Sequence, residues 1–573
     1  MGEVASSNLV VPTNFLPIPF RLLMVVDIDR RVAGGSLQQL WGVRVWWKDG
    51  VIYQVYPRSF QDSNGDGVGD LRGILSRLDY LVELGVDAIW ISPFYPSPMA
   101  DFGYDVADYT DVDPIFGTLD DFDRLIEGIH RRGLKLILDF VPNHTSDQHP
   151  WFRESRSSRD DPKRDWYLWR DPAADGGVPN NWMSHFGGSA WTFDEGTGQY
   201  FFHSFLTAQP DLNWRNPEVR EAMYSAMRFW LDRGVDGFRM DVLWLLIKDD
   251  QFRSNPQNPD WSPGGSSFGS VLPLYSSDRP ETHAIVREMR SVLDAYPERV
   301  LIGEIYLPLT QLVTYYGPDS NSMDLRGADM PFNFHLIQTA WKADDIARLI
   351  IKYEGLLPAG AWPNWVLGNH DQPRLATRVG EAQARVAAML LLTLRGTPTL
   401  YNGDELALRD GVISADQVMD PAEKNQPGIG MGRDPERTPM PWDATPNAGF
   451  TAGTPWLPMS PDSAQKAVAS QADAPRSVLA LYRQLLALRR RYDALHAGEI
   501  AEVRAEGGVL SYQRVSGEQR LHVLLNLTDE VQEIAAPRGR ILLTTILDGA
   551  GAEVGGRFTL EGREGVLLEL PPA

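Results

Sequence analysis

Three acidic residues end apolar stretches that lie far apart in this chain of 573 residues. Val235 to Met240 leads to Asp241, Leu301 to Gly303 leads to Glu304, and Val366 to His370 leads to Asp371. A carboxylate at the tip of a buried strand is costly unless it is used or paired. Acids so far apart can meet only if one sheet gathers the strand ends, as a parallel barrel does. We therefore predict an α/β fold organised around such a barrel.

The chain repeats one order of elements: a helix, a glycine and an apolar strand. Val51 to Val55 is a first predicted strand. The following helix places these residues on one face: Leu71, Ile74, Leu75, Leu78, Leu81 and Val82. Gly85 ends that helix and residues 86–91 form the next strand. The order recurs around Gly133 and Gly234, which is typical of βα units on a parallel sheet.

Two segments break this order and suggest further domains. Residues 145–212 show no sustained helical period and are rich in Gly, Pro and Asp, so we expect an irregular inserted subdomain. After a long helix near Pro475 to Tyr492, the apolar period changes to two, which predicts an antiparallel β-domain over 498–573. The barrel is expected over 46–144 and 213–497. Residues 1–45 match no motif, and we interpret them as an N-terminal extension or a start codon assigned too early.

The composition limits the partners. A formal net charge of −22 argues against nucleic acid and anionic membranes, which both need a basic face. The chain has no cysteine, so disulfides and thiolate chemistry are excluded. Prolines and charges interrupt the apolar residues of the N-terminus, and we expect a cytoplasmic protein without a membrane span. It would act as a monomer or a small homo-oligomer on small molecules.

Paired carboxyl groups suggest hydrolysis of a glycosidic bond. One carboxyl group acts as nucleophile or base, and another protonates the leaving oxygen. Arg239 lies two residues before Asp241, so on a strand both side chains point to the same face. We expect this cation to keep Asp241 ionised. Taken alone, the Arg239 and Asp241 pair fits a structural role equally well.

A second group of polar residues follows the first strand. Oxygen-bearing side chains alternate with glycines from Asp62 to Asp70, which suits a loop that binds Ca²⁺ or Mg²⁺. The alternative is a plain turn without metal. Such a site would be structural, because it has no place in acid–base chemistry.

Four segments together resemble the ordered sequence regions of the α-amylase superfamily, glycoside hydrolase family 13. They are Asp139 to His144, Gly237 to Asp241, Gly303 to Glu304, and Asn369 to Arg374. The resemblance implies a (β/α)8 TIM barrel, an inserted subdomain after strand 3 and a C-terminal antiparallel β-domain. It covers about residues 46–573.

Residue roles follow from the same resemblance. Asp241 corresponds to the nucleophile, Glu304 to the acid and base, and Asp371 to the third acid, which holds ring hydroxyls. The residues that correspond to substrate-binding positions are Tyr104, Asp105, His144, Arg239, His370 and Arg374. Among these, Asp105 with Arg374 is expected to close the pocket on a non-reducing-end glucose, which implies exo-action, and Tyr104 to stack on the sugar. The loop also resembles a family calcium site with the ligands Asp62, Asn64, Asp66, Val68 (carbonyl) and Asp70.

Two further segments point to the oligo-1,6-glucosidase group. Gln209 to Asn213 matches its fifth region, and Arg437 to Trp442 matches except that Pro441 replaces an expected Gln. Val242, directly after the nucleophile, is the residue type that accompanies α-1,6 preference, although a methyl group or two in a pocket changes discrimination by only about 1–3 kcal/mol. We therefore expect a retaining, exo-acting α-glucosidase of the oligo-1,6-glucosidase type that favours α-1,6 over α-1,4 bonds in short substrates.

Two alternatives stay open. A transglucosylase or isomerase, trehalose-synthase-like or sucrose-acting, would use the same residues, because hydrolysis and transfer share their first half-reaction. A non-catalytic relative that acts as an interaction protein would lack the acids that this chain retains.

Overall fold

The computed structural model describes residues 45–318 and 324–572 of the chain. The expected extension over residues 1–45 therefore lies almost entirely outside the described residues.

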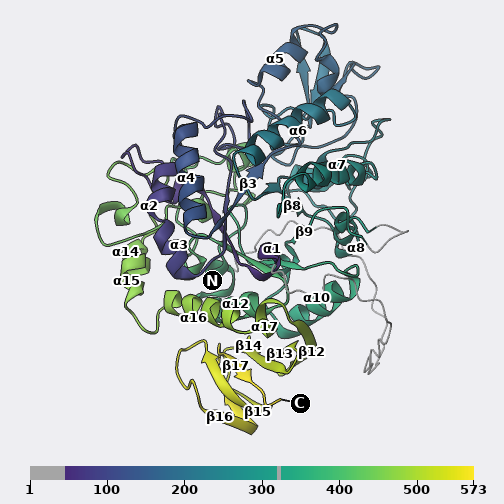
Figure 1. Cartoon of the computed structure of the whole chain (residues 1–573). Helices are drawn as coiled ribbons and strands as arrows, with labels where there is room; N and C mark the ends of the chain where they lie inside the picture. The colour runs from purple at the N-terminus through teal and green to yellow at the C-terminus, as the bar shows by residue number, and fades with distance from the viewer. Residues whose placement is uncertain (1–44, 319–323, 573) are drawn as a thin grey trace.

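Eight parallel strands form the central sheet (Figure 1). Their order is β10-β11-β1-β2-β3-β7-β8-β9, and β9 lies against β10, so the sheet curls into a barrel that is not hydrogen-bonded between these two strands. The strands are β1 (Ile52–Val55), β2 (Ala88–Ile91), β3 (Lys135–Phe140), β7 (Gly237–Met240), β8 (Val300–Ile305), β9 (Met330–Asn333), β10 (Asn364–Val366) and β11 (Thr397–Tyr401). The predicted parallel barrel is confirmed.

Helices cover the outside of the barrel, and apolar residues fill both the interior and the helix–strand layer. Ile52, Trp90 and Phe332 belong to the interior group, whereas Phe122, Leu125 and other buried residues of α4 pack outside. The helices are α1 (Trp46–Asp49), α2 (Leu71–Ser76), α3 (Leu78–Leu84), α4 (Leu119–Arg131), α6 (Pro217–Asp232), α7 (Thr282–Asp294), α8 (Leu309–Leu312), α9 (His335–Gln338), α10 (Ala343–Leu356), α11 (Leu375–Val379), α12 (Glu381–Thr393), α13 (Pro421–Asn425), α14 (Ser463–Lys466), α15 (Val468–Ala472), α16 (Val478–Arg491) and α17 (Asp493–His496).

The first predicted helix is two helices. Arg77 has φ −106° and ψ 6°, which ends α2 and starts α3 on a new axis. Val82 is consequently 40% exposed and does not share the buried face that the sequence pattern predicted. Gly85 ends α3 as predicted, with φ +100°.

The inserted segment follows β3 and forms a small antiparallel sheet at one end of the molecule (Figure 1). Its order is β4-β6-β5, with β4 (Trp169–Arg170), β5 (Trp191–Asp194) and β6 (Gln199–Phe202). It also contains a helix that the periodicity missed, α5 (Pro150–Ser157), whose first turn is capped by the His149 side chain.

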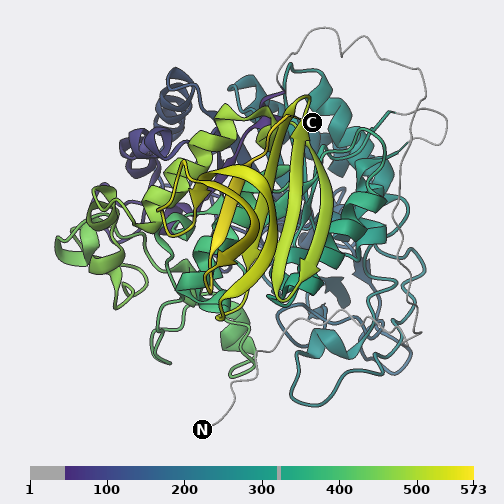
Figure 2. The same cartoon turned by 90° about the horizontal axis from the view of Figure 1, so that it is seen from below.

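A six-stranded antiparallel sheet forms the opposite end of the molecule (Figure 1) and lies in front of the barrel when the molecule is seen from below (Figure 2). It packs on α10, α12 and α17. Its order is β12-β13-β14-β17-β15-β16. The strands are β12 (Glu499–Glu506), β13 (Val509–Ser516), β14 (Gln519–Asn526), β15 (Gln532–Thr544), β16 (Glu553–Leu560) and β17 (Gly565–Glu569). This confirms the C-terminal β-domain. The sequence pattern missed β12 and β16, because polar residues and glycines interrupt their apolar residues and every residue of the two strands except Leu560 is at least partly exposed.

Candidate active site

Arg239 joins three carboxyl groups at the carboxyl ends of neighbouring strands. Its Nη1 donates to Asp241 at 2.7 Å and to Asp139 at 2.9 Å, and its Nη2 lies 2.7 Å from Glu304 Oε1. Asp139 is on β3, Arg239 is on β7 two residues before Asp241, and Glu304 is on β8. The Arg239 side chain is fully buried. The structure therefore brings together two of the three predicted acids, with Asp139 as an additional partner.

Burial sets the ionisation of this group. Burial and the neighbouring Glu304 raise the pKa of Asp241 well above its usual value, and Arg239 only partly offsets this. Burial likewise raises the pKa of Glu304. The prediction that Arg239 keeps Asp241 ionised is wrong, because the guanidinium is divided among three carboxyl groups. The pKa of Asp241 and that of Glu304 are therefore both raised, as is usual for close buried carboxyl groups.

Asp371 has different partners, and it stays ionised. Arg437 Nη2 donates to its Oδ1 at 2.8 Å, and Arg433 Nη1 does so at 3.3 Å. Burial alone would raise the pKa of Asp371, but His370, Arg437 and Arg433 hold it well below its usual value. Burial also lowers the pKa of His370 far enough to keep that ring neutral at pH 7. The two guanidinium groups are therefore what stabilises the Asp371 carboxylate.

Tyr104 and His370 lie between these two groups. Their rings are stacked at 5.3 Å with an interplanar angle of 7°. Gln54 Nε2 donates to His370 Nδ1 at 2.7 Å, so the ring hydrogen is on Nε2, which lies 2.6 Å from Tyr104 Oη. Tyr104 Oη in turn donates to Asp139 at 3.0 Å. The chain of hydrogen bonds ties His370 to the carboxyl groups around Arg239.

The predicted pair of Asp105 and Arg374 does not form. Asp105 accepts the Ser97 hydroxyl and the backbone N–H groups of Ala100 and Asp101, and Arg374 donates to the Asn402 carbonyl at 2.9 Å. Asp105 therefore organises its own loop.

The ion pair in this region is Asp101 with Arg433. Arg433 Nη2 lies 2.6 Å from Asp101 and 2.9 Å from Asp420, while its Nη1 contacts Asp371. Asp101 precedes Tyr104 in the same loop, and Arg433 follows β11. The sequence offered one signal for this pair: Asp101 belongs to the same short segment as Tyr104.

A buried lysine connects the inserted segment to His144. Lys248 Nζ contacts Asp211 and donates to Asn143 Oδ1 at 2.7 Å, and Asn143 Nδ2 donates to Asp211 at 2.9 Å. Asn143 Oδ1 accepts the hydrogen bond from Lys248, so the amide nitrogen Nδ2 is the atom that faces His144 Nδ1, at 3.1 Å. His144 Nε2 then donates to the Tyr104 carbonyl. Asp211 belongs to the Gln209 to Asn213 segment, but no sequence pattern pointed to Lys248.

The Asp62 to Asp70 loop is held by hydrogen bonds to its own backbone. Asp62 accepts N–H groups of Asn64, Gly65 and Gly67, and Asp66 accepts that of Val68. Within the described ranges, no three Asp, Glu, His or Cys side chains gather as metal ligands. The hard oxygen atoms of Asp62, Asn64, Asp66 and Asp70 still suit Ca²⁺ chemically.

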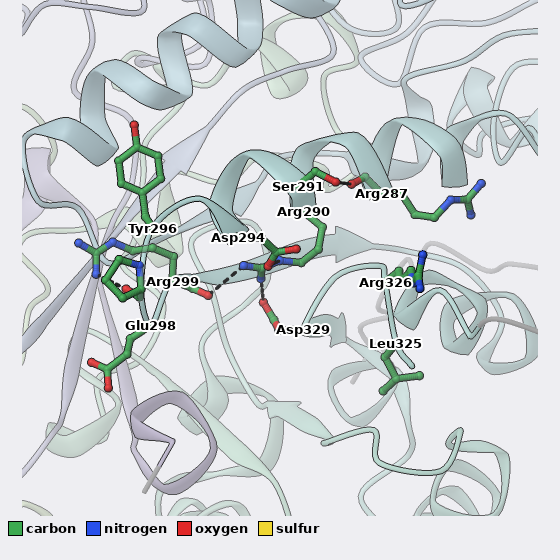
Figure 3. A pocket seen from close by; sticks show the side chains of 11 residues that line it. Arg287, Arg290, Ser291, Asp294, Tyr296, Glu298, Arg299, Leu325, Arg326 and Asp329 are labelled. Atoms are coloured by element: carbon green, nitrogen blue, oxygen red, sulfur yellow. Dashed lines mark hydrogen bonds and ion pairs between the residues drawn. The ribbon is translucent and has the colours of Figure 1, made fainter. Parts of the chain in front are cut away.

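A cavity of about 700 Å³ lies elsewhere, between the C-terminal end of α7 and the segment before β9 (Figure 3). Arg290 contacts Asp294 and Asp329, and Arg299 lies 3.5 Å from Asp236. In Figure 3 the Arg287 side chain extends away from Asp329. None of the candidate catalytic residues lines this cavity, so we assign it no part in catalysis.

In the described part of the chain no helix is long and apolar enough to cross a membrane.

Comparisons with known proteins found relatives that cover most of the chain. The family described as "Alpha amylase, catalytic domain" matches residues 54–498. A protein of Rhizobium meliloti (strain 1021) named "Probable alpha-glucosidase" is 43% identical over 87% of this chain and 92% of its own length. An oligo-1,6-glucosidase of Parageobacillus thermoglucosidasius is 39% identical, over 86% and 92%. A crystal structure of an α-glucosyl transfer enzyme superposes with a TM-score of 0.86 at 42% identity, covering 92% of this chain and 99% of the other.

Proposed function

The chain belongs to the α-amylase family, glycoside hydrolase family 13, and from this premise we propose that it is a retaining, exo-acting α-glucosidase. It would release glucose from the non-reducing end of short α-glucosides, with α-1,6 bonds favoured and α-1,4 bonds possible. The observation that carries the proposal is the contact of Arg239 with both Asp241 and Glu304, which supports their use as a nucleophile and an acid because the two carboxyl groups lie side by side. Retaining glycosidases need such a close pair.

The first step forms a covalent intermediate. Asp241 attacks the anomeric carbon as the glycosidic C–O bond breaks, and Glu304 gives its proton to the leaving oxygen. In the reactive form Glu304 carries the proton and Asp241 is ionised. Asp371, kept ionised by Arg433 and Arg437, would bind ring hydroxyls and stabilise the positive charge that develops on the sugar.

The second step releases glucose. Glu304, now a carboxylate, takes a proton from water as the water oxygen attacks the anomeric carbon and the ester to Asp241 breaks. His144, His370 and Tyr104 are neutral polar groups that would hold the sugar during both steps. The Asp101–Arg433 ion pair beside Asp371 would close the pocket behind the non-reducing end, which supports exo-action.

Transfer to a sugar acceptor is the second candidate. The likeness to the α-glucosyl transfer enzyme favours it, because a sugar hydroxyl can replace water in the second step. A linkage preference for α-1,6 rests on Val242 and on the similarity to oligo-1,6-glucosidases.

A product time course tests both candidates. Purified protein is offered isomaltose, maltose, sucrose and a long maltodextrin, with Asp241→Asn as the inactive control. Glucose released fastest from isomaltose supports the α-1,6-leaning glucosidase. New oligosaccharides or sucrose isomers as the main products would assign the protein to transfer or isomerisation, and no reaction with any substrate would contradict the proposal.

Three accompanying proposals concern the rest of the molecule. The Asp62 to Asp70 loop would hold a structural Ca²⁺ through the side chains of Asp62, Asn64, Asp66 and Asp70 and the Val68 carbonyl; the ion has no role in the two chemical steps. The protein would work in the cytoplasm as a monomer or small homo-oligomer. Its strong negative charge supports the absence of nucleic acid and membrane partners.

A further inference from the structure

The backbone directly after Asp241 adopts a conformation that its side chain disfavours. Val242 has φ +39° and ψ +45°, the left-handed region in which a β-branched residue is a rare outlier. The residue is 6% exposed, so surrounding contacts hold it there. A 3₁₀ turn, Leu243–Leu245, follows, and its Leu245 N–H donates to the Val242 carbonyl at 2.9 Å. Strain of this kind persists where it serves a site.

The left-handed turn aims one N–H group at the proposed acid. The Val242 N–H donates to Glu304 Oε2 at 2.8 Å. The turn also lies close to β8, because Gly303 has no side chain: a Cβ atom there would lie 2.7 Å from Leu243 Cδ2. Two independent features, a strained residue after β7 and a glycine on β8, therefore bring this N–H to Glu304.

Both oxygen atoms of Glu304 are thus held from the strand that carries the nucleophile. Arg239, two residues before Asp241, has its Nη2 beside Glu304 Oε1. Val242, the residue after Asp241, donates its N–H to Glu304 Oε2. A peptide N–H cannot lose its proton or rotate away as a side chain can. Both contacts to Glu304 therefore come from the segment that carries Asp241.

We propose that the main-chain N–H of Val242 is a positioning donor for Glu304: it sets the acid's distance from the nucleophile and stabilises the carboxylate left after the leaving oxygen is protonated. This rests on the proposed α-glucosidase function. It differs from a role of the Val242 side chain in linkage preference, because any residue except proline supplies the N–H.

The donor has a predictable effect on pH dependence. A hydrogen bond to the ionised form lowers the pKa of a carboxyl group, and the Val242 N–H acts on Glu304 in this direction. Its removal should move the alkaline limb of kcat/KM to higher pH by about one unit.

The test removes the N–H alone. Val242 is replaced by its α-hydroxy acid counterpart, which keeps the side chain and puts an ester oxygen in place of the N–H. The matched control is the same exchange at Leu245, which breaks a hydrogen bond of the same turn without touching Glu304. Circular dichroism checks that both proteins are folded.

The substrates are α-glucosyl fluoride, whose leaving group needs no protonation, and maltose or isomaltose, whose leaving oxygen does. We expect the Val242 ester to lose at least ten times more activity on the disaccharides than on the fluoride, with the shifted alkaline limb; the Leu245 ester should show neither. Equal losses on both substrate types, or the same pattern in the Leu245 ester, would overturn the proposal. If the wild type cleaves no α-glucoside, the fluoride included, the function itself fails and this proposal with it.

Discussion

Replacing Lys248 by methionine should destabilise the protein through the charge that it leaves behind. Lys248 is 1% exposed and Asp211 is fully buried, and the ammonium group contacts the carboxylate directly. Methionine has a similar length and fills the space of the lysine stem. The change Lys248→Met therefore removes the cation with little loss of packing and leaves the buried Asp211 carboxylate without a cation.

The structure sets the size of the effect. Removing one partner of a buried pair usually costs about 3–5 kcal/mol. Asp211 keeps three neutral donors, the Ser204 N–H at 2.6 Å, the Ser204 hydroxyl at 2.7 Å and Asn143 Nδ2 at 2.9 Å, so we expect the lower end, about 3 kcal/mol. The second change Asp211→Asn removes the stranded charge. The double variant should recover part of the loss.

The pH dependence separates this cause from a packing defect. Burial would raise the pKa of Asp211, but Lys248 and the other partners hold it below its usual value. In the wild type this stabilisation is complete above the usual carboxyl pKa and is lost as pH falls through the lowered one. In Lys248→Met the pKa of Asp211 rises, so protonation relieves the penalty at a higher pH. The difference between the two proteins should be largest at pH 7 to 8 and shrink towards pH 4.

Thermal unfolding followed by circular dichroism provides the measurement. The apparent unfolding temperature of Lys248→Met should fall by about 2–3 °C at pH 7. The control Lys163→Met breaks a partly exposed pair with Glu154, which is worth about 0–1 kcal/mol. If Lys248→Met unfolds like the wild type, or if Asp211→Asn deepens its defect at every pH, the reasoning is refuted.

Three further predictions concern the site, the loop and a distant carboxyl group. Arg433→Met should lower kcat/KM for isomaltose by roughly 100-fold, because about 3 kcal/mol of charge stabilisation at Asp371 is lost. Arg374→Met should lower kcat/KM by less than tenfold when the two variants are assayed at the same folded fraction. Equal losses of kcat/KM in the two variants would contradict the assignment of the Asp101–Arg433 ion pair to the pocket. Chelation of Ca²⁺ should lower the apparent unfolding temperature, and added Ca²⁺ should restore it, by mass action on the Asp62 loop; no response to either reagent would argue for a plain turn. Burial raises the pKa of Asp404 to about 6, so this carboxyl group destabilises the folded state fully above pH 6, and the penalty shrinks as pH falls from 6 and vanishes only below the usual carboxyl pKa. Asp404→Asn should therefore raise the unfolding temperature more at pH 8 than at pH 5 and should not raise it at about pH 3; a gain that is equal at all three pH values would point to another cause.

The strand ends were predictable, because a polar residue after a buried apolar run is rare and its position on the sheet follows from the strand. Asp241, Glu304 and Arg239 were found in this way, and the structure places them in contact. Asp139 stood inside a recognised segment without an assigned role. Its contact with Arg239 depends on the pairing of β3 with β7.

The loops were not predictable in the same way. Asp101 and Arg433 come from loops 332 residues apart, and no periodicity relates one loop to another. Asp105 was chosen instead because it follows Tyr104, yet its carboxylate is used by the backbone of its own turn. Lys248 was missed because a sequence does not distinguish a buried lysine from a surface lysine unless the partners of its ammonium group are known. Ionisation was mispredicted for Asp241, because a sequence shows a neighbouring cation but not how many carboxyl groups compete for it.

The composition of the site also bears on which sugars can enter it. Carboxyl groups outnumber guanidinium groups among the contacts described above: Asp101, Asp139, Asp241, Glu304, Asp371 and Asp420 against Arg239, Arg433 and Arg437. The histidines are neutral at pH 7, so they add no compensating charge. A proton held by either Asp241 or Glu304 does not remove the surplus. We therefore expect the pocket to repel phosphorylated or otherwise anionic glucosides and to bind amines that mimic a cationic sugar as inhibitors.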